Sequence, residues 1–203
     1  MKDGVFMDSF VYHGSSNGSI LEFKPFKSTH NKKCIYATPN LCAALLFTHH
    51  GNRDLDVRIS TKNGILELVE RREGILKSLY GRPGYVYKLD ASTFKHYDYL
   101  WSMEVISFED SIKPIDKIYY ENILKEIEKE EENSNIVIYR YPTRPSDVPL
   151  DNSDLIDKYI EYEKNGLDNA TDLLLNIYPE FTPIVERKIK DEKERYKNNW
   201  YNT

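Results

Sequence analysis

The chain has 203 residues, 40% of them hydrophobic and 30% charged, which suffices for one domain with a sizeable core and an extension. Its formal net charge of −5 argues against a general nucleic-acid binder, and its two cysteines are too few for a disulfide framework. Because the chain shows no apolar signal segment and no apolar run near the ~20 residues of a membrane span, we expect a cytoplasmic protein without a membrane partner.

Alternating apolar residues and strong turn signals predict a first part that is rich in strands. The expected strands are residues 9–14, 35–38, 55–60 and 85–89 and a hairpin over 104–119. Thr38-Pro39 is typical of a helix start, with Thr as the cap, so a helix is expected from about 40 to 50. A second helix is expected over 65–80, where apolar residues recur at roughly helical intervals.

The composition changes after Tyr120, where charged, helix-forming segments begin. The expected elements are an acidic helix over 121–132, an edge strand over 136–141, and helices over 151–164, 168–177 and 183–198. We therefore predict an α+β protein with a strand-rich domain at 1–120. A mostly helical extension at 121–203 is expected to pack on or beside it.

Three of the expected strands each carry one polar side chain suited to a common chemistry. His13 ends the first strand, Tyr36 lies in the second, and Glu104 opens a strand far downstream. Cleavage of a bond between ribose and nicotinamide develops positive charge on the ribose, as glycoside hydrolysis does. An imidazole can hold a ribose hydroxyl, an aromatic ring can lie against nicotinamide, and a carboxylate can stabilise the developing cation.

The segments Tyr12-His13-Gly14-Ser15, Tyr36-Ala37-Thr38 and Ser102-Met103-Glu104-Val105-Ile106 resemble the His-Tyr-Glu signature of the ADP-ribosyltransferase superfamily. The branch concerned contains diphtheria toxin and the poly-ADP-ribose polymerases, and the resemblance covers roughly residues 9–120. It implies a split β-sandwich of two small, mostly antiparallel sheets with flanking helices.

The resemblance also implies NAD as co-substrate, with Glu104 as the catalytic carboxylate. The residues implied to bind NAD are His13, Gly14, Ser15, Tyr36 and Phe47, the last being the aromatic residue that follows Tyr36 by eleven positions. Arginine-modifying members carry Glu or Gln two residues before the catalytic Glu, whereas this chain has Ser102, so the acceptor stays open between protein, nucleobase, small molecule and water. By analogy, a toxin or modifying enzyme of a bacterium or phage fits such a domain.

Each of these residues also has a purely structural interpretation. His13 can satisfy a turn carbonyl, Tyr36 and Phe47 can be core rings whose burial contributes about 2 kcal/mol, and Glu104 competes with Glu109 and Asp110. The alternative function is therefore a non-catalytic binding module that engages a partner through its cleft or helical tail. Removal of an RNA 2′-phosphate is disfavoured, because the chain is acidic and the further His and Arg residues of that chemistry cannot be assigned.

The chain lacks the sequence motifs that are typical of other cofactor-binding proteins. The chain contains no GxGxxG fingerprint and no phosphate-binding GxxxxGK[ST] motif. No metal is expected, because the adjacent pair His49-His50 would project about 100° apart on a helix.

Overall fold

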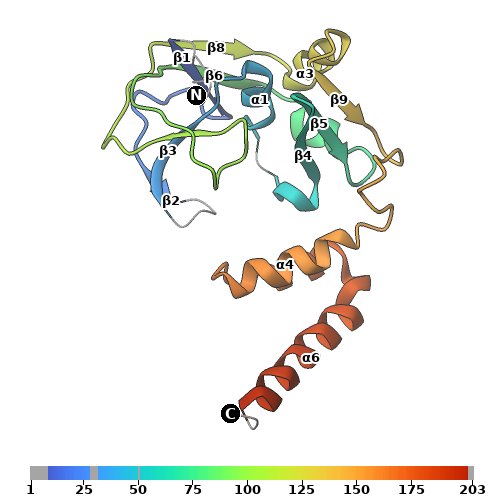
Figure 1. Ribbon diagram of the computed structural model, residues 1–203. Coiled ribbons are helices and arrows are strands. Elements are labelled where there is room, and N and C mark those ends of the chain that lie inside the picture. The colour runs from blue at the N-terminus through green and yellow to red at the C-terminus, as the bar shows by residue number, and fades with distance from the viewer. Residues whose placement is uncertain (1–8, 28–31, 50, 201–203) are drawn as a thin grey trace. The chain divides into compact units, whose positions relative to one another are not determined.

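The computed structural model describes residues 9–27, 32–49 and 51–200 of the chain. The chain divides into two compact units, Met1–Pro142 and Thr143–Thr203, and Figure 1 shows strands and helices in the first and helices in the second. The protein is therefore α+β, as the sequence predicts.

The first unit carries all the strands that the described residues form. Its strands are β1 (Phe10–Ser15), β2 (Phe26–Lys27), β3 (Lys33–Ala37), β4 (Val57–Lys62), β5 (Ile65–Glu70), β6 (Gly84–Asp90), β7 (Val105–Ser107), β8 (Asp116–Tyr120) and β9 (Ile136–Tyr139). Its helices are α1 (Leu41–Leu46), the 3-10 helix η1 (Arg53–Leu55), α2 (Ile75–Tyr80) and α3 (Ile123–Glu132).

These strands form three sheets of three strands each, with the orders β1-β6-β8, β2-β3-β7 and β4-β5-β9. All pairings are antiparallel except that of β5 with β9, which is parallel. Two backbone hydrogen bonds join the first two sheets: Tyr12 N–H donates to the Thr38 carbonyl at 2.7 Å, and Thr38 N–H donates to the Tyr12 carbonyl at 2.9 Å.

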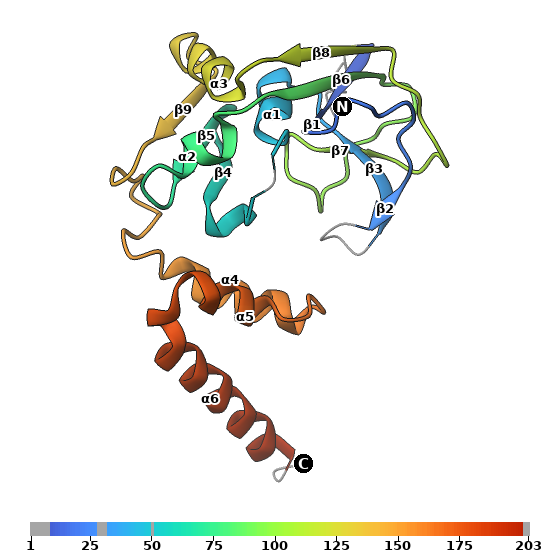
Figure 2. The same ribbon diagram turned by 180° about the vertical axis from the view of Figure 1, so that it is seen from behind.

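Helix α1 lies between the sheet of β1 and β6 and the sheet of β4 and β5, as both ribbon views show (Figures 1 and 2). Its buried side chains share one core cluster with Leu66, Leu68 and Ile123. Its backbone also lies against β1, since a Cβ atom added to Gly14 would come within 1.9 Å of the Ala44 carbonyl oxygen. A side chain at position 14 is therefore incompatible with this packing.

The helix expected over 65–80 is wrong in its first half, which is strand β5. The two residues between β4 and β5, Asn63 and Gly64, have φ values of 52° and 80°, as a tight hairpin turn requires. Asn-Gly between apolar runs is a strong signal for a hairpin turn, so the sequence indicated this hairpin. The helix-like spacing of Leu66 and Val69 instead favoured a helix.

Two further expectations on local structure are also corrected. The hairpin over 104–119 does not form, because β7 pairs with β3 whereas β8 pairs with β6. Helix α1 is capped by the side chain of Asn40, which accepts from Ala43 N–H, and not by Thr38. It ends at Leu46, earlier than expected.

The boundary between the two units lies at Pro142, whereas the sequence analysis put it at residue 120. Helix α3 belongs to the first unit because Ile123 and Ile127 are buried in its core. Strand β9 belongs there because it pairs with β5 from Leu66↔Ile136 to Val69↔Tyr139.

The second unit consists of α4 (Asp154–Lys164), α5 (Ala170–Ile177), η2 (Pro179–Phe181) and α6 (Thr182–Trp200). Leu155 and Tyr159 on α4 are buried, and the rings of Tyr178 and Phe181 stack with centroids 5.4 Å apart. Within the described part of the chain, none of the helices has both the length and the apolar character needed to cross a bilayer.

The left-handed backbone of the Asn63-Gly64 turn leads us to expect that a side chain at position 64 destabilises the protein. Gly64→Ala should lower the free energy of unfolding by about 1 kcal/mol, because a left-handed conformation is costly for a residue with a Cβ atom. Nothing lies within 4 Å of the added Cβ atom, so the effect is conformational and not steric. Urea unfolding measures it, with Lys62→Ala as the control; equal losses in the two variants would contradict the turn assignment.

We predict that the folded protein loses stability in alkali because of the Cys42 thiol on α1. Burial, and secondarily the charge of Glu130, raises its pKa from 9.0 to about 12. The folded state thus keeps a proton that the unfolded chain releases, so this contribution is complete below pH 9 and falls as the pH rises toward 12. Urea unfolding at neutral pH and between pH 9 and 10 should show a decline that is shallower in Cys42→Ala; an identical decline would exclude this thiol as its source.

Candidate functional site

His13 and Tyr36, predicted to act together, are in direct contact. The His13 Nδ1 atom lies 2.7 Å from the Tyr36 main-chain oxygen. Because a carbonyl oxygen only accepts hydrogen bonds, Nδ1 is the donor, and the neutral imidazole then carries its lone pair on Nε2. The His13 ring also packs on Phe23, with centroids 4.6 Å apart, so its orientation is held from two sides.

The side chain of Tyr36 is largely covered. Only 8% of the residue is exposed, and it belongs to a cluster with Cys34, Leu100 and Ile106. Its ring lies 5.3 Å from the ring of Phe26. The structural interpretation of Tyr36 as a core ring is therefore supported in this conformation.

Glu104 directly precedes β7, at the point where this strand reaches the first two segments. Val105 pairs with Ala37, so the next position of this register brings Glu104 opposite Thr38. Thr38 is in turn bonded to Tyr12, the neighbour of His13. His13, Tyr36 and Glu104 thus belong to three neighbouring segments of the chain.

The main chain of Glu104 is held by two residues that the sequence analysis did not identify. Its N–H donates to the Trp101 carbonyl at 2.8 Å, and its carbonyl accepts from Nδ1 of His96 at 2.9 Å. The residue is half-buried. Trp101 could have been noticed as a large ring three residues before the candidate carboxylate, whereas nothing in the sequence distinguishes His96.

Phe47 caps the C-terminal end of α1 and is 36% exposed. Its ring meets that of Trp101 edge-on, with centroids 5.9 Å apart. Since Trp101 accepts the hydrogen bond from Glu104 N–H, Phe47 contacts the turn that carries the candidate carboxylate. This contact joins the ends of two elements that are more than 50 residues apart in the sequence.

The remaining two predicted residues have structural partners. The α-carbon of Gly14 faces the backbone of α1, as described above. The Ser15 hydroxyl accepts from Asn17 N–H at 3.1 Å, which shapes the loop after β1. Their expected contacts with NAD stay predictions.

A second group of charged residues is buried in the first unit and was not predicted. Asp56 forms an ion pair with Arg72 and accepts from Asn52 N–H at 2.6 Å. Glu70 accepts from the backbone N–H groups of Leu76 at 3.2 Å and Tyr141 at 3.0 Å. These carboxylates hold loops and helix starts, which is a structural role.

The described residues contain no group of three or more His, Cys, Asp or Glu side chains placed to hold a metal ion. His49 donates through Nε2 to the Pro83 carbonyl at 3.1 Å, and its neighbour His50 lies outside the described residues.

Comparisons with protein-family models, curated proteins and solved structures find no match to this chain. The chemistry of the site is therefore the basis for inferring its function.

Because His13 contacts Tyr36, we expect two variants of His13 to differ in their free energy of unfolding. His13→Leu should lose about 1 kcal/mol of unfolding free energy, because the Tyr36 carbonyl loses a donor. His13→Asn should lose less, because an Asn amide can replace the Nδ1 donor. Thermal or urea unfolding compares the two, and equal stability of the Leu and Asn variants would show that this bond contributes nothing.

Proposed function

We propose that the protein is an NAD-dependent ADP-ribosyltransferase that cleaves the bond between nicotinamide and ribose. The observation that supports this most is the register of β3 and β7. Its last pair is Ala37↔Val105, and one further position would bring Glu104 opposite Thr38, near the bonded pair His13 and Tyr36. Three short motifs can resemble the signature of a family without lying close together in the fold. In this protein the three segments are neighbours.

The proposed roles follow from the chemistry of each group. NAD supplies a leaving group that departs as neutral nicotinamide, taking both electrons of the broken bond to ribose. The His13 ring, oriented by its Nδ1 contact with the Tyr36 carbonyl, is suited to hydrogen-bond a ribose hydroxyl. The Glu104 carboxylate is suited to bond the second ribose hydroxyl and to stabilise the positive charge on the ribose.

The proposed nicotinamide site requires aromatic faces. Phe47 is the more accessible candidate, with 36% of the residue exposed. Tyr36 is packed with Leu100, so its ring can meet nicotinamide only if the segment around Leu100 shifts. We therefore propose that Phe47 forms the first contact and that Tyr36 becomes available upon binding.

We also propose that the first unit has the fold of an ADP-ribosyltransferase. The sheets β1-β6-β8 and β2-β3-β7, joined through Tyr12 and Thr38, support the two-sheet core of an ADP-ribosyltransferase. The third sheet, β4-β5-β9, lies outside this two-sheet core. A reducing compartment such as the cytoplasm is consistent with Cys34 and Cys42, which are both buried and not disulfide-bonded.

Two observations favour the alternative, a non-catalytic binding module. The 8% exposure of Tyr36 and the packing of Gly14 on α1 are what a purely structural scaffold would show. Isothermal titration with NAD separates the two functions, since the enzyme requires saturable binding and the module does not.

Glu104 provides the direct test of catalysis. Glu104→Gln should lower the rate of nicotinamide release by at least about 100-fold, because the neutral amide cannot stabilise the developing cation. Affinity for NAD, measured by titration, should change far less. Glu109→Gln is the matched control, as this exposed residue lies two positions beyond β7. Equal release by wild type and Glu104→Gln would falsify the assigned role.

A further inference from the structure

The loop after β1, residues 16–20, is anchored by side chains of the two neighbouring strands. The Tyr87 hydroxyl on β6 donates to the Asn17 carbonyl at 2.8 Å and accepts from Ile20 N–H at 3.1 Å. The Lys117 Nζ atom on β8 donates to the Gly18 carbonyl at 2.5 Å. Three main-chain groups of one short loop are thus bonded to two side chains.

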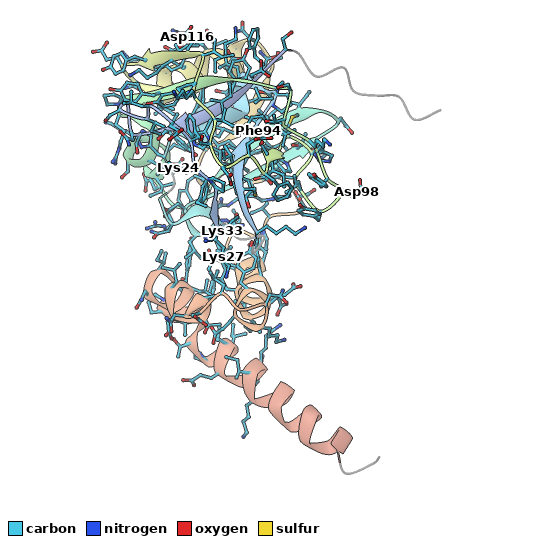
Figure 3. The ribbon with its side chains drawn as sticks, turned by 90° about the vertical axis from the view of Figure 1, so that its left-hand side faces the viewer. Lys24, Lys27, Lys33, Phe94, Asp98 and Asp116 are labelled. Carbon is cyan, nitrogen blue, oxygen red and sulfur yellow. The ribbon has the colours of Figure 1, made fainter. Side chains whose placement is uncertain are left out.

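Both of these side chains lie in one row of the sheet with His13. The register pairs His13 with Tyr87 and Tyr87 with Lys117. Side chains directly opposite each other in neighbouring strands point to the same face of a sheet. Figure 2 shows β1, β6 and β8 side by side, and Figure 3 labels Asp116, which precedes Lys117 on β8. The two anchors of the loop therefore lie on the sheet face that carries the candidate ribose-binding side chain.

Tyr87 also supports the ring of His13. Phe23 contacts both rings, with its centroid 4.6 Å from that of His13 and 5.2 Å from that of Tyr87, which it meets edge-on. Tyr87 is 1% exposed and belongs to a core cluster with Phe23 and with Phe94, which Figure 3 labels. The imidazole is thus held by the Tyr36 carbonyl and, through Phe23, by the Tyr87 ring.

The loop after β1 packs closely on the same sheet. A Cβ atom added to Gly18 would come within 2.3 Å of the Tyr85 ring, so the main chain of the loop lies directly on this ring. Tyr85 pairs with Ser15, and the Ser15 hydroxyl accepts from Asn17 N–H. A displacement of the loop would therefore also disturb the end of β1, which carries three of the residues proposed to bind NAD.

We propose that Tyr87 is a positioning residue of the NAD site, assisted by Lys117; this inference rests on the proposed function. Phenylalanine would fill the same core space, so the hydroxyl is the part of the side chain that serves the loop. The hydroxyl fixes the loop, and the ring fixes the imidazole through Phe23. The site is then formed before NAD arrives, and binding does not have to order it.

Tyr87→Phe tests this role because it keeps the ring and removes only the hydroxyl. The Kd for NAD, measured by isothermal titration, and the KM for nicotinamide release should rise about tenfold, because the loop must then be ordered upon binding. The kcat should change less than about threefold, since Glu104 keeps its partners. Unchanged Kd and KM would overturn the positioning role.

Ser60→Ala is the matched control. It removes another partly buried hydroxyl, which donates to the Glu67 carboxylate at 3.1 Å within the sheet β4-β5-β9. Both variants should lower the midpoint of thermal unfolding by a few degrees, whereas only Tyr87→Phe should weaken NAD binding. Equal weakening in the two variants would show that it follows from lost stability, and would overturn the proposal.

Lys117 provides a second variant, at an exposed position. Lys117→Met should raise the Kd for NAD about threefold, and Lys117→Arg should restore it, because a guanidinium can also donate to the Gly18 carbonyl. Lys125→Met removes the same charge from α3 and should leave the Kd unchanged. Equal losses in Lys117→Met and Lys125→Met would assign the effect to overall charge and would overturn the assisting role of Lys117.

Hydrogen exchange without NAD separates this inference from the proposed function. The Ile20 amide should exchange at least about tenfold faster in Tyr87→Phe than in wild type, while Ser60→Ala should match wild type. Equal exchange in wild type and Tyr87→Phe would overturn the anchor even if NAD binds. Faster exchange in Tyr87→Phe, together with no NAD binding by wild type, would overturn the proposed function and the positioning role but leave the loop anchor established.

Discussion

The backbone hydrogen bonds between Tyr12 and Thr38 are the constraint on which the candidate site depends. They join the sheet of β1 to the sheet of β3 and hold His13 within reach of the Tyr36 carbonyl. The pairing of β3 with β7 then brings Glu104 to the same region. Since backbone groups form these bonds, the arrangement requires the strand geometry and not a specific side chain at each position. Gly14 contributes by its lack of a side chain, which lets α1 lie directly on β1.

Tyr36 is subject to two opposing demands. Burial of a ring of this size stabilises the fold by about 2 kcal/mol, whereas contact with a ligand needs an open face. Leu100 and Tyr97, which belong to the same cluster, lie in the segment before β7, and this segment also includes His96 and Trp101, the two residues that hold the Glu104 main chain. If this segment shifts to uncover Tyr36, as the proposed function requires, the main chain of Glu104 would be expected to move with it. Such coupling would link nicotinamide binding to placement of the carboxylate, in the manner of other enzymes that complete their sites upon binding.

Elements that depend on local interactions were predictable from the sequence, whereas those that depend on distant segments were not. The strands at 9–14, 35–38 and 85–89 depend on local alternation and turn residues, and β1, β3 and β6 occur there. The helix expected over 65–80 was wrong over its first half, because Leu66 and Val69 fit a helical period while the neighbouring strands impose an extended one; its second half contains α2. Parallel pairing with β9 joins segments some 70 residues apart, and no local pattern predicts such a partner.

The sequence by itself determined the inventory of this protein: an α+β chain, a helical C-terminal part, and the residue types that could act on a ribosyl bond. These depend on composition and on periods of a few residues, which a single chain displays directly. Only the tertiary structure decided that β7 pairs with β3 and not with β8, that Trp101 and His96 hold Glu104, and that Tyr36 is covered. Those outcomes come from competition among distant segments for the same backbone partners and the same core space, which depends on the whole fold.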